Sequence, residues 1–166
     1  MSVRPLRTDD AEACDQIVHG LPHFFGNEAG LLECARAVRT ARGWVVDGTD
    51  GVEAFLTVDF PLPSAPEITW MAVRADRRRR GRGRMLMERV TRELADEGCP
   101  LLSVLTLAAS VPERGTDTYA GTRTFYRTMR FLDVRELHPP GWDHAALLLV
   151  RPLQGWSPTV RRTARP

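Results

Sequence analysis

The sequence contains no lysine, because all 23 basic residues of the 166-residue chain are arginine. This absence excludes every mechanism that needs a lysine amine, including Schiff-base catalysis and the phosphate-binding loop G-x-x-x-x-G-K-[ST]. Arginine is also unevenly placed, since six of the eight residues from Arg77 to Arg84 are arginine and the other two are Gly81 and Gly83. Function is therefore sought first in this segment.

Cysteine is scarce, and its placement excludes two classes of small domain. Cys14, Cys34 and Cys99 are odd in number, far apart and never spaced as C-x-x-C. A disulfide scaffold and a zinc knuckle are therefore excluded, and no metal is expected. Cys99 has no obvious base beside it and is interpreted as a small apolar residue.

Long hydrophobic runs are absent too. The first residues lack the apolar run of a signal peptide, and the longest aliphatic stretch, 145–150, is too short to cross a bilayer. We therefore expect a soluble, cytoplasmic protein without a membrane partner. The length is typical of one domain, predicted over residues 1–153, followed by an arginine- and proline-containing tail over 154–166.

Hydrophobic periodicity and turn residues predict a mixed α/β domain with a largely antiparallel sheet. Helices are predicted after a cap at Thr8 as far as about His19, over 28–40 with Asn27 as its cap, after the arginine-rich segment as far as Gly98, and over 121–129. Strands are predicted over 3–7, 44–46, 52–60, 67–74, 101–107, 132–137 and 145–150.

The arginine-rich segment joins a predicted strand to a predicted helix. A helix N-terminus presents unpaired amides and a positive dipole, which favours anions. Gly81 and Gly83 let the backbone approach a ligand, and guanidinium groups add charge-assisted hydrogen bonds, so a diphosphate or polyphosphate is expected here. The dinucleotide fingerprint G-x-G-x-x-G does not fit, because Leu86 stands where glycine or alanine is needed.

Two motifs resemble those of the GNAT acetyltransferases. Arg78-Arg79-Arg80-Gly81-Arg82-Gly83 matches their loop [Q/R]-x-x-G-x-[G/A], and the segment 125–131 resembles their element F-Y-x-x-x-G-F. The chain departs from the second pattern, with Arg130 in place of glycine and with Tyr119 and Thr122 where asparagine and alanine are frequent. The resemblance spans about residues 6–152. It implies the GNAT fold of a small single-domain bacterial member, a twisted, largely antiparallel sheet of roughly six to seven strands with about four helices.

The resemblance also implies a donor, acetyl-CoA, and residues that bind it. Main-chain groups of the strand end would bind the pantetheine arm, namely Met71, Ala72 and Val73. The loop and the helix start would hold the pyrophosphate, through Arg78, Arg79, Arg80, Gly81, Arg82, Gly83 and Arg84. Tyr126 takes the position of the acid that protonates the departing thiolate, and Glu67 resembles a general base; a core tyrosine and a solvated glutamate are the alternatives.

Acceptor residues are expected in two loops. His23, Phe24 and Phe25 lie between the first two helices, where members of this family commonly build one wall of the acceptor pocket. Trp142 and Asp143 precede the last strand, and Asp143 or Asp117 could attract a cationic amine. Ordinary loop packing is the alternative for each of them.

The expected activity is acetyl transfer from acetyl-CoA to a primary amine of a small molecule, such as an aminoglycoside-like antibiotic or a polyamine, by direct attack in a ternary complex. A protein N-terminal or lysine acetyltransferase and a non-catalytic CoA-binding sensor remain alternatives. A nucleic-acid binder is disfavoured, because no aromatic residue interleaves with the arginines. The sequence leaves the acceptor, the acyl length and a homodimer open.

Overall fold

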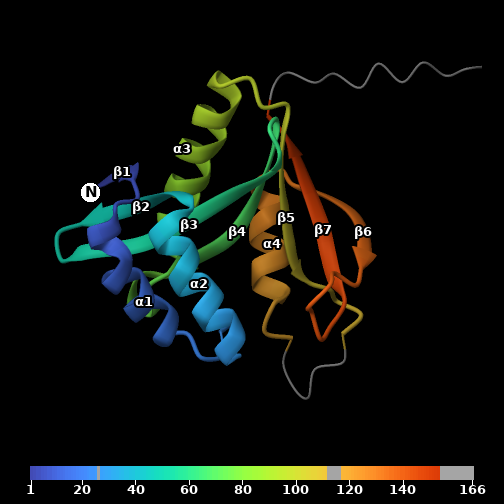
Figure 1. Ribbon diagram of the computed structural model, residues 1–166, viewed down its shortest axis with the longest axis horizontal. Helices are drawn as coiled ribbons and strands as arrows, with labels where there is room; N and C mark the ends of the chain where they lie inside the picture. The colour runs from blue at the N-terminus through green and yellow to red at the C-terminus, as the bar shows by residue number, and fades with distance from the viewer. Residues whose placement is uncertain (26, 112–116, 154–166) are drawn as a thin grey trace, which may run out of the picture.

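Within the described residues, seven strands form one sheet in the order β1-β2-β3-β4-β5-β7-β6 (Figure 1). The computed structural model describes residues 1–25, 27–111 and 117–153. The strands are β1 (Ser2–Pro5), β2 (Arg42–Gly48), β3 (Gly51–Leu62), β4 (Ala65–Val73), β5 (Leu101–Leu107), β6 (Leu132–Leu137) and β7 (Ala146–Pro152). Neighbours pair antiparallel except β4 and β5, which are parallel. The predicted mixed α/β fold is confirmed.

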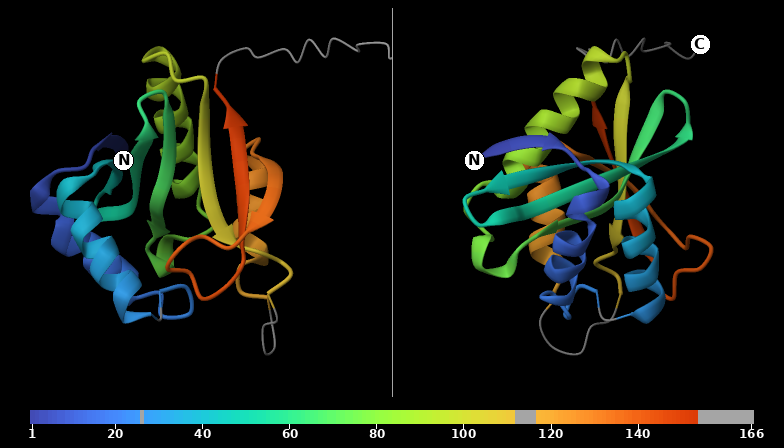
Figure 2. Two further views of the ribbon diagram at one scale, coloured as in Figure 1. Left: turned by 45° about the vertical axis from the view of Figure 1, so that its right-hand side comes forward. Right: turned by 60° about the vertical axis from the view of Figure 1, so that its left-hand side comes forward.

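Helices cover both faces of this sheet. They are α1 (Ala11–His19), α2 (Glu28–Thr40), α3 (Arg82–Asp96) and α4 (Ala120–Thr128), with short 3₁₀ turns at Thr8–Asp10 and Ala75–Arg77. Figure 2 shows α1 and α2 on one face and α3 and α4 on the other. None of the helices in the described part of the chain is long and apolar enough to cross a membrane.

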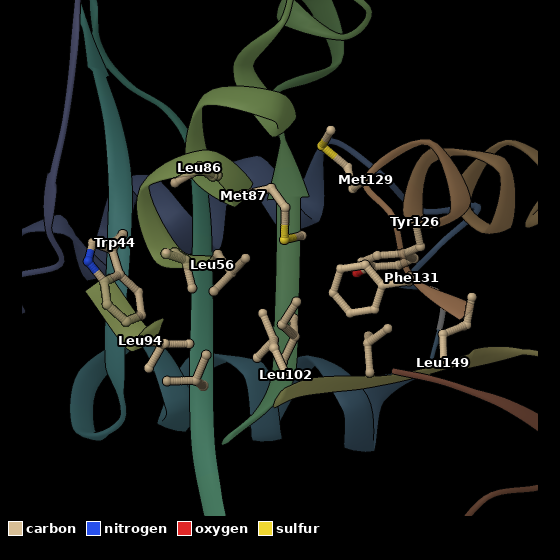
Figure 3. Packing of buried hydrophobic residues seen from close by; sticks show 14 of the residues in the cluster. Trp44, Leu56, Leu86, Met87, Leu94, Leu102, Tyr126, Met129, Phe131 and Leu149 are labelled. Carbon is tan, nitrogen blue, oxygen red and sulfur yellow. The ribbon is translucent and has the colours of Figure 1, made fainter. Parts of the chain in front are cut away.

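The core has two layers because successive residues of the central strands point to opposite faces. Val45 and Phe55 pack with α1 and α2, whereas Val46 and Leu56 pack with α3 and α4. Figure 3 shows the second of these layers, which extends to α4. Both faces of β2 and β3 are covered, so these strands are apolar nearly throughout.

Most helix ends follow the sequence signals. The Asn27 side chain accepts from the Ala29 amide at 2.9 Å and caps α2 as predicted. After α3, Gly98 takes a left-handed conformation with φ 87°.

The prediction that Thr8 caps the first helix is wrong. Asp10 accepts from the Arg7 amide at 2.9 Å and from Arg4 at 2.7 Å, which holds a separate 3₁₀ turn. The α-helix therefore begins at Ala11.

The three cysteines are buried and free. Burial raises the pKa of Cys14 and of Cys34 to about 12 and raises the pKa of Cys99 as well. They are packing residues with little thiolate character, as interpreted for Cys99.

Candidate active site

Strands β4 and β5 separate partway along their length. Only two residue pairs join them, Glu67 with Ser103 and Ile68 with Val104. Yet β4 continues to Val73 and β5 to Leu107. In Figure 1 the two strands lie close together at the top of the sheet and diverge downward, with α4 behind the opening. The edge of Met71–Val73 that faces β5 therefore has no strand partner, which leaves main-chain groups available to a ligand.

A β-bulge lies where the pairing between β4 and β5 ends. Thr57 of β3 is opposite Trp70, but the next residue, Val58, is opposite Ile68, so Thr69 is an extra residue in β4. The hydroxyls of Thr57 and Thr69 are 2.8 Å apart and share a hydrogen bond across the bulge. A bulge bends its strand and changes the direction of the side chains that follow. Here it accompanies the divergence of β4 from β5.

The arginine loop, residues 77–84, leads from β4 into α3. Arg79 and Gly81 adopt left-handed conformations with φ 57° and 82°, and Gly81 is the N-cap of α3. The Met85 amide donates to the Gly81 carbonyl at 3.0 Å, as the first intrahelical bond. The three amides before it, of residues 82–84, have no acceptor within the helix. Together with the helix dipole these amides make the turn suitable for an anion, and the diphosphate expected here stays a prediction.

Buried Glu53 of β3 holds two of the arginines in this loop. Its carboxylate accepts from Arg77 Nε at 3.0 Å and from Arg82 Nε at 2.6 Å, and Arg82 also donates to the Arg80 carbonyl at 2.8 Å. Hydrogen bonding to Arg82, followed by its charge and by Arg77, lowers the pKa of Glu53. The side chain of Arg82 therefore braces the loop, whereas those of Arg78, Arg79, Arg80 and Arg84 are exposed.

Gly83 joins this turn to the opening between the strands. A Cβ at Gly83 would lie 3.2 Å from Met71 Cε on β4 and 3.2 Å from Phe125 Cζ on α4. The start of α3 thus lies against both the separated part of β4 and the helix behind the opening. A ligand bound at the helix amides can extend directly along β4.

Tyr126 extends from α4 into the core. Its ring packs edge-on against Phe125 and Phe131, with centroids 5.5 and 5.3 Å away, and Figure 3 shows it reaching toward Leu102 and Met87. Only 5% of the residue is exposed. Burial raises the pKa of the phenol, so it is protonated at neutral pH and gives up its proton only to a strongly basic group, such as a departing thiolate.

The hydroxyl of Thr106, on the same side of the sheet as Tyr126, has no hydrogen-bond partner among the described residues. Thr106 is on β5, beyond the last pair with β4. It points to the same face as Leu102 and Val104, which pack in the cluster that contains Tyr126. Among the described residues, no group bonds its buried Oγ1. A buried polar atom without a partner is costly. The opening therefore suits a guest with polar groups, such as the amides of a pantetheine arm.

Glu67 lies at the closed end of the opening. It is opposite Asp59 on β3 and Ser103 on β5, and it is half-buried. Burial, assisted by the charge of Asp59, raises its pKa, while hydrogen bonding to Ser103 opposes the change. A carboxylate in this environment is a better base near neutral pH than an exposed glutamate.

The loop between α1 and α2 reaches both the arginine loop and α4. The Arg78 guanidinium lies 4.6 Å from the centre of the Phe24 ring, and the Tyr119 hydroxyl donates to the Phe24 carbonyl at 2.8 Å. Phe25 packs against Trp70 of β4, with centroids 6.0 Å apart. His23 is exposed beside them. The predicted acceptor wall is thus close to the predicted donor loop.

The other predicted acceptor residues do not join this group. Asp117 forms an ion pair with buried Arg123, and that arginine also donates to the Leu107 carbonyl at 2.8 Å. This pairing uses the Asp117 charge to anchor the start of α4. Asp143 lines a separate surface hollow between the segments that follow β5 and β6, next to exposed Trp142. No residue of the α1–α2 loop is among its described lining residues.

Three features of the site were not anticipated. Glu53 could have been noticed as the one charge inside the apolar run 52–58, but its partners lie 24 and 29 residues away. The bulge at Thr69 and the contact between Tyr119 and Phe24 had no local signal. Among the described side chains no group of three potential metal ligands occurs.

Comparison with known proteins identifies the family. A model of the acetyltransferase (GNAT) family matches residues 19–115, more than half of the chain. No curated protein matches the sequence.

Solved structures share the fold at low identity. A GNAT-family protein from Desulfovibrio desulfuricans superimposes with a TM-score of 0.77 and 17% identity, over 92% of this chain and 99% of the other. The ribosomal-protein-S18-alanine N-acetyltransferase of Escherichia coli superimposes with a TM-score of 0.72 and 16% identity, over 96% of this chain and 97% of the other. An aminoglycoside 6′-N-acetyltransferase complexed with coenzyme A superimposes with a TM-score of 0.70 and 16% identity, over 95% of this chain and 99% of the other. The chain belongs to the GNAT family of acetyltransferases.

Proposed function

We propose that the protein transfers an acetyl group from acetyl-CoA to a primary amine of a small molecule. The observation that carries the proposal is the continuity of three features: the free amides that begin α3, the packing of Gly83 against Met71, and the unpaired edge of β4. A carrier with a pyrophosphate at one end and an amide-containing arm at the other matches that sequence of features.

The donor would bind along β4 with its reactive end toward the closed end of the opening. The amides of residues 82–84 and the exposed arginines 78, 79, 80 and 84 would hold the pyrophosphate. Main-chain groups of Met71–Val73 would bond the pantetheine amides. Arg82 contributes through its amide, because Glu53 already engages its side chain.

The reaction itself needs a base and an acid. Glu67 accepts a proton from the acceptor ammonium, directly or through water, and the neutral amine attacks the thioester carbonyl carbon. A C–N bond forms and the C–S bond breaks, with a backbone amide of β4 stabilising the negative carbonyl oxygen. Tyr126 then donates its proton to the departing thiolate, and the proton that the attacking nitrogen loses as the amide forms passes, directly or through water, to the phenolate and restores the phenol.

The acceptor would lie on the side of the α1–α2 loop, where Phe24, Phe25 and Trp70 provide aromatic surface and Glu67 provides negative charge. This combination favours a cationic amine with an apolar body. Two of the similar structures bear names that specify an aminoglycoside and a ribosomal-protein alanine as acceptors. At their low identity both acceptor types belong in the test.

The test combines coenzyme A binding with turnover. Isothermal calorimetry with coenzyme A is expected to give one site per chain. Thiol release from acetyl-CoA is then measured with aminoglycosides, polyamines, arylalkylamines and peptides with a free N-terminus or a lysine. Turnover with a small amine supports the proposal. Turnover with peptides alone would show that the acceptor is a peptide or protein and not a small molecule. Binding without any turnover indicates a sensor, and absence of binding contradicts the assignment of the donor site.

A further inference from the structure

Three side chains from separate parts of the fold meet beside the opening of the sheet. Arg78 belongs to the arginine loop and Phe24 to the α1–α2 loop, while Tyr119 is the residue that precedes α4. The Arg78 guanidinium stacks 4.6 Å above the Phe24 ring. Phe24 also packs edge-on against the Tyr119 ring, with centroids 5.4 Å apart and planes at 68°. The group joins elements from both sides of the opening.

Tyr119 fixes this arrangement through its hydroxyl. It donates to the Phe24 carbonyl at 2.8 Å, so the backbone of the α1–α2 loop is tied to α4 across 95 residues of sequence. Only a side chain long enough to cross the opening and ending in a donor makes this bond. The asparagine that is frequent here in the resembled pattern is too short to make the same contact.

Stacking leaves Arg78 free to bind phosphate. A guanidinium held over an aromatic ring by its charge keeps its five N–H donors for other partners. The Phe24 ring therefore restricts the rotamers of Arg78 without using its donors. An anion at the edge of Arg78 would make the stack more favourable, because both interactions need the same guanidinium position.

We propose that Arg78, Phe24 and Tyr119 form a clasp that couples binding of the donor pyrophosphate to the position of the α1–α2 loop. The inference rests on the proposed function and adds a property that it lacks: the two substrate sites are energetically linked. Phe24 and Tyr119 are positioning residues, since they act through Arg78 and through the loop. Linkage is reciprocal, so an occupied donor site also improves binding of the acceptor.

The first experiment measures coenzyme A affinity by calorimetry. Phe24→Leu removes the aromatic face and is expected to raise the Kd about two- to fivefold, the range for an exposed cation–π contact. Phe24→Tyr keeps the ring and restores wild-type affinity. Phe60→Leu, at a partly buried phenylalanine near the end of β3, is the matched control and leaves the Kd unchanged.

The second experiment measures amide hydrogen exchange of residues 21–25 with and without coenzyme A. In the wild type coenzyme A slows exchange of this loop. In Tyr119→Phe the ring contact remains but the bond to the Phe24 carbonyl is lost, so the slowing is largely abolished. Wild-type affinity in Phe24→Leu, or undiminished slowing in Tyr119→Phe, overturns the clasp while the proposed function stands. Failure of the wild type to bind coenzyme A overturns both.

Discussion

Arg130 holds a left-handed conformation, φ 67°, directly after α4. Its amide donates to the Arg127 carbonyl at 2.9 Å and the Phe131 amide donates to the Tyr126 carbonyl at 3.0 Å. This is the helix ending that glycine usually provides. The chain therefore keeps the turn of the F-Y-x-x-x-G-F element with a residue that has a Cβ, which costs about 1 kcal/mol.

Replacing Arg130 by glycine is expected to stabilise the protein by about 1 kcal/mol, because the strain of the Cβ disappears. Urea unfolding at pH 7 measures the gain. Arg130→Ala removes the same charge but keeps a Cβ, and it is expected to give no gain. Equal stabilisation by both variants would mean that charge, and not backbone strain, is responsible.

Tyr126→Phe tests the acid. Loss of the hydroxyl is expected to lower kcat by about 100-fold or more, since a positioned acid contributes that much, while the ring continues to pack against Phe131. The Kd for coenzyme A should remain close to that of the wild type. An unchanged kcat would remove Tyr126 from the mechanism.

Glu67→Gln tests the base through the pH dependence of kcat/KM. Burial and Asp59 raise the pKa of Glu67, so the acid limb of the wild-type profile is expected above the ordinary glutamate value of about 4.3. The variant should lose this limb together with about 100-fold in rate. Asp59→Asn removes a charge that raises this pKa, so it should keep activity and move the limb to lower pH. A profile that keeps its limb in Glu67→Gln would assign the base elsewhere.

At the scale of elements, the turn between β4 and α3 combines a helix start with a close contact to two neighbouring elements. Gly83 has ordinary backbone angles, and what requires glycine there is space, because Met71 and Phe125 are within contact distance of any Cβ. The contact atoms are the ends of flexible side chains, so the fold can adapt to a larger residue. A larger side chain at residue 83 would, however, occupy the space in which the proposed pyrophosphate lies and through which the donor enters the opening.

Gly83→Val is therefore expected to fold but to lose at least about tenfold in coenzyme A affinity, the equivalent of one or two lost hydrogen bonds to a charged group. Calorimetry measures the affinity, and circular dichroism checks the fold. Gly121→Val, in a helical position with open space around it, is the matched control. Unchanged binding by Gly83→Val would exclude the cradle.

Local sequence signals predicted the elements, whereas contacts between distant residues were missed. The strands Leu101–Leu107 and Leu132–Leu137 begin and end where apolar patterns and turn residues place them. Asn27 marked one helix start and Gly98 one helix end for the same reason. Glu53 and its arginines, and Tyr119 with Phe24, are brought together only by the packed sheet. Local signals were thus enough to predict the elements, but not the contacts between distant residues that brace the candidate site.

At the scale of the whole molecule, ion pairs between arginine and carboxylates join one element of the fold to another. Arg4 pairs with Asp10, Arg42 with Glu97, and Arg127 with Asp133. In each case the arginine lowers the pKa of the carboxyl group. A carboxylate whose pKa is lower in the folded state stabilises the fold above its unfolded pKa and loses that contribution as the pH falls through its folded pKa.

The free energy of unfolding is therefore expected to be nearly constant from neutral pH down to about 5 and to fall below about 4, where these groups gain protons. Urea unfolding at several pH values measures it. Asp10→Asn should flatten the acid side of this curve, because it removes one depressed group, whereas the exposed neighbour variant Asp9→Asn should not. A curve that is equally steep for Asp10→Asn would attribute acid sensitivity to other carboxylates.

The burial of all three cysteines has a practical consequence for enzymology. A chromogenic disulfide reagent finds no accessible sulfur on the folded protein, so the colour that develops during a reaction measures the carrier alone. When the same reagent is added to the protein alone, the rate of the reaction measures how often the protein opens, since each sulfur reacts only after the side chains packed around it have separated.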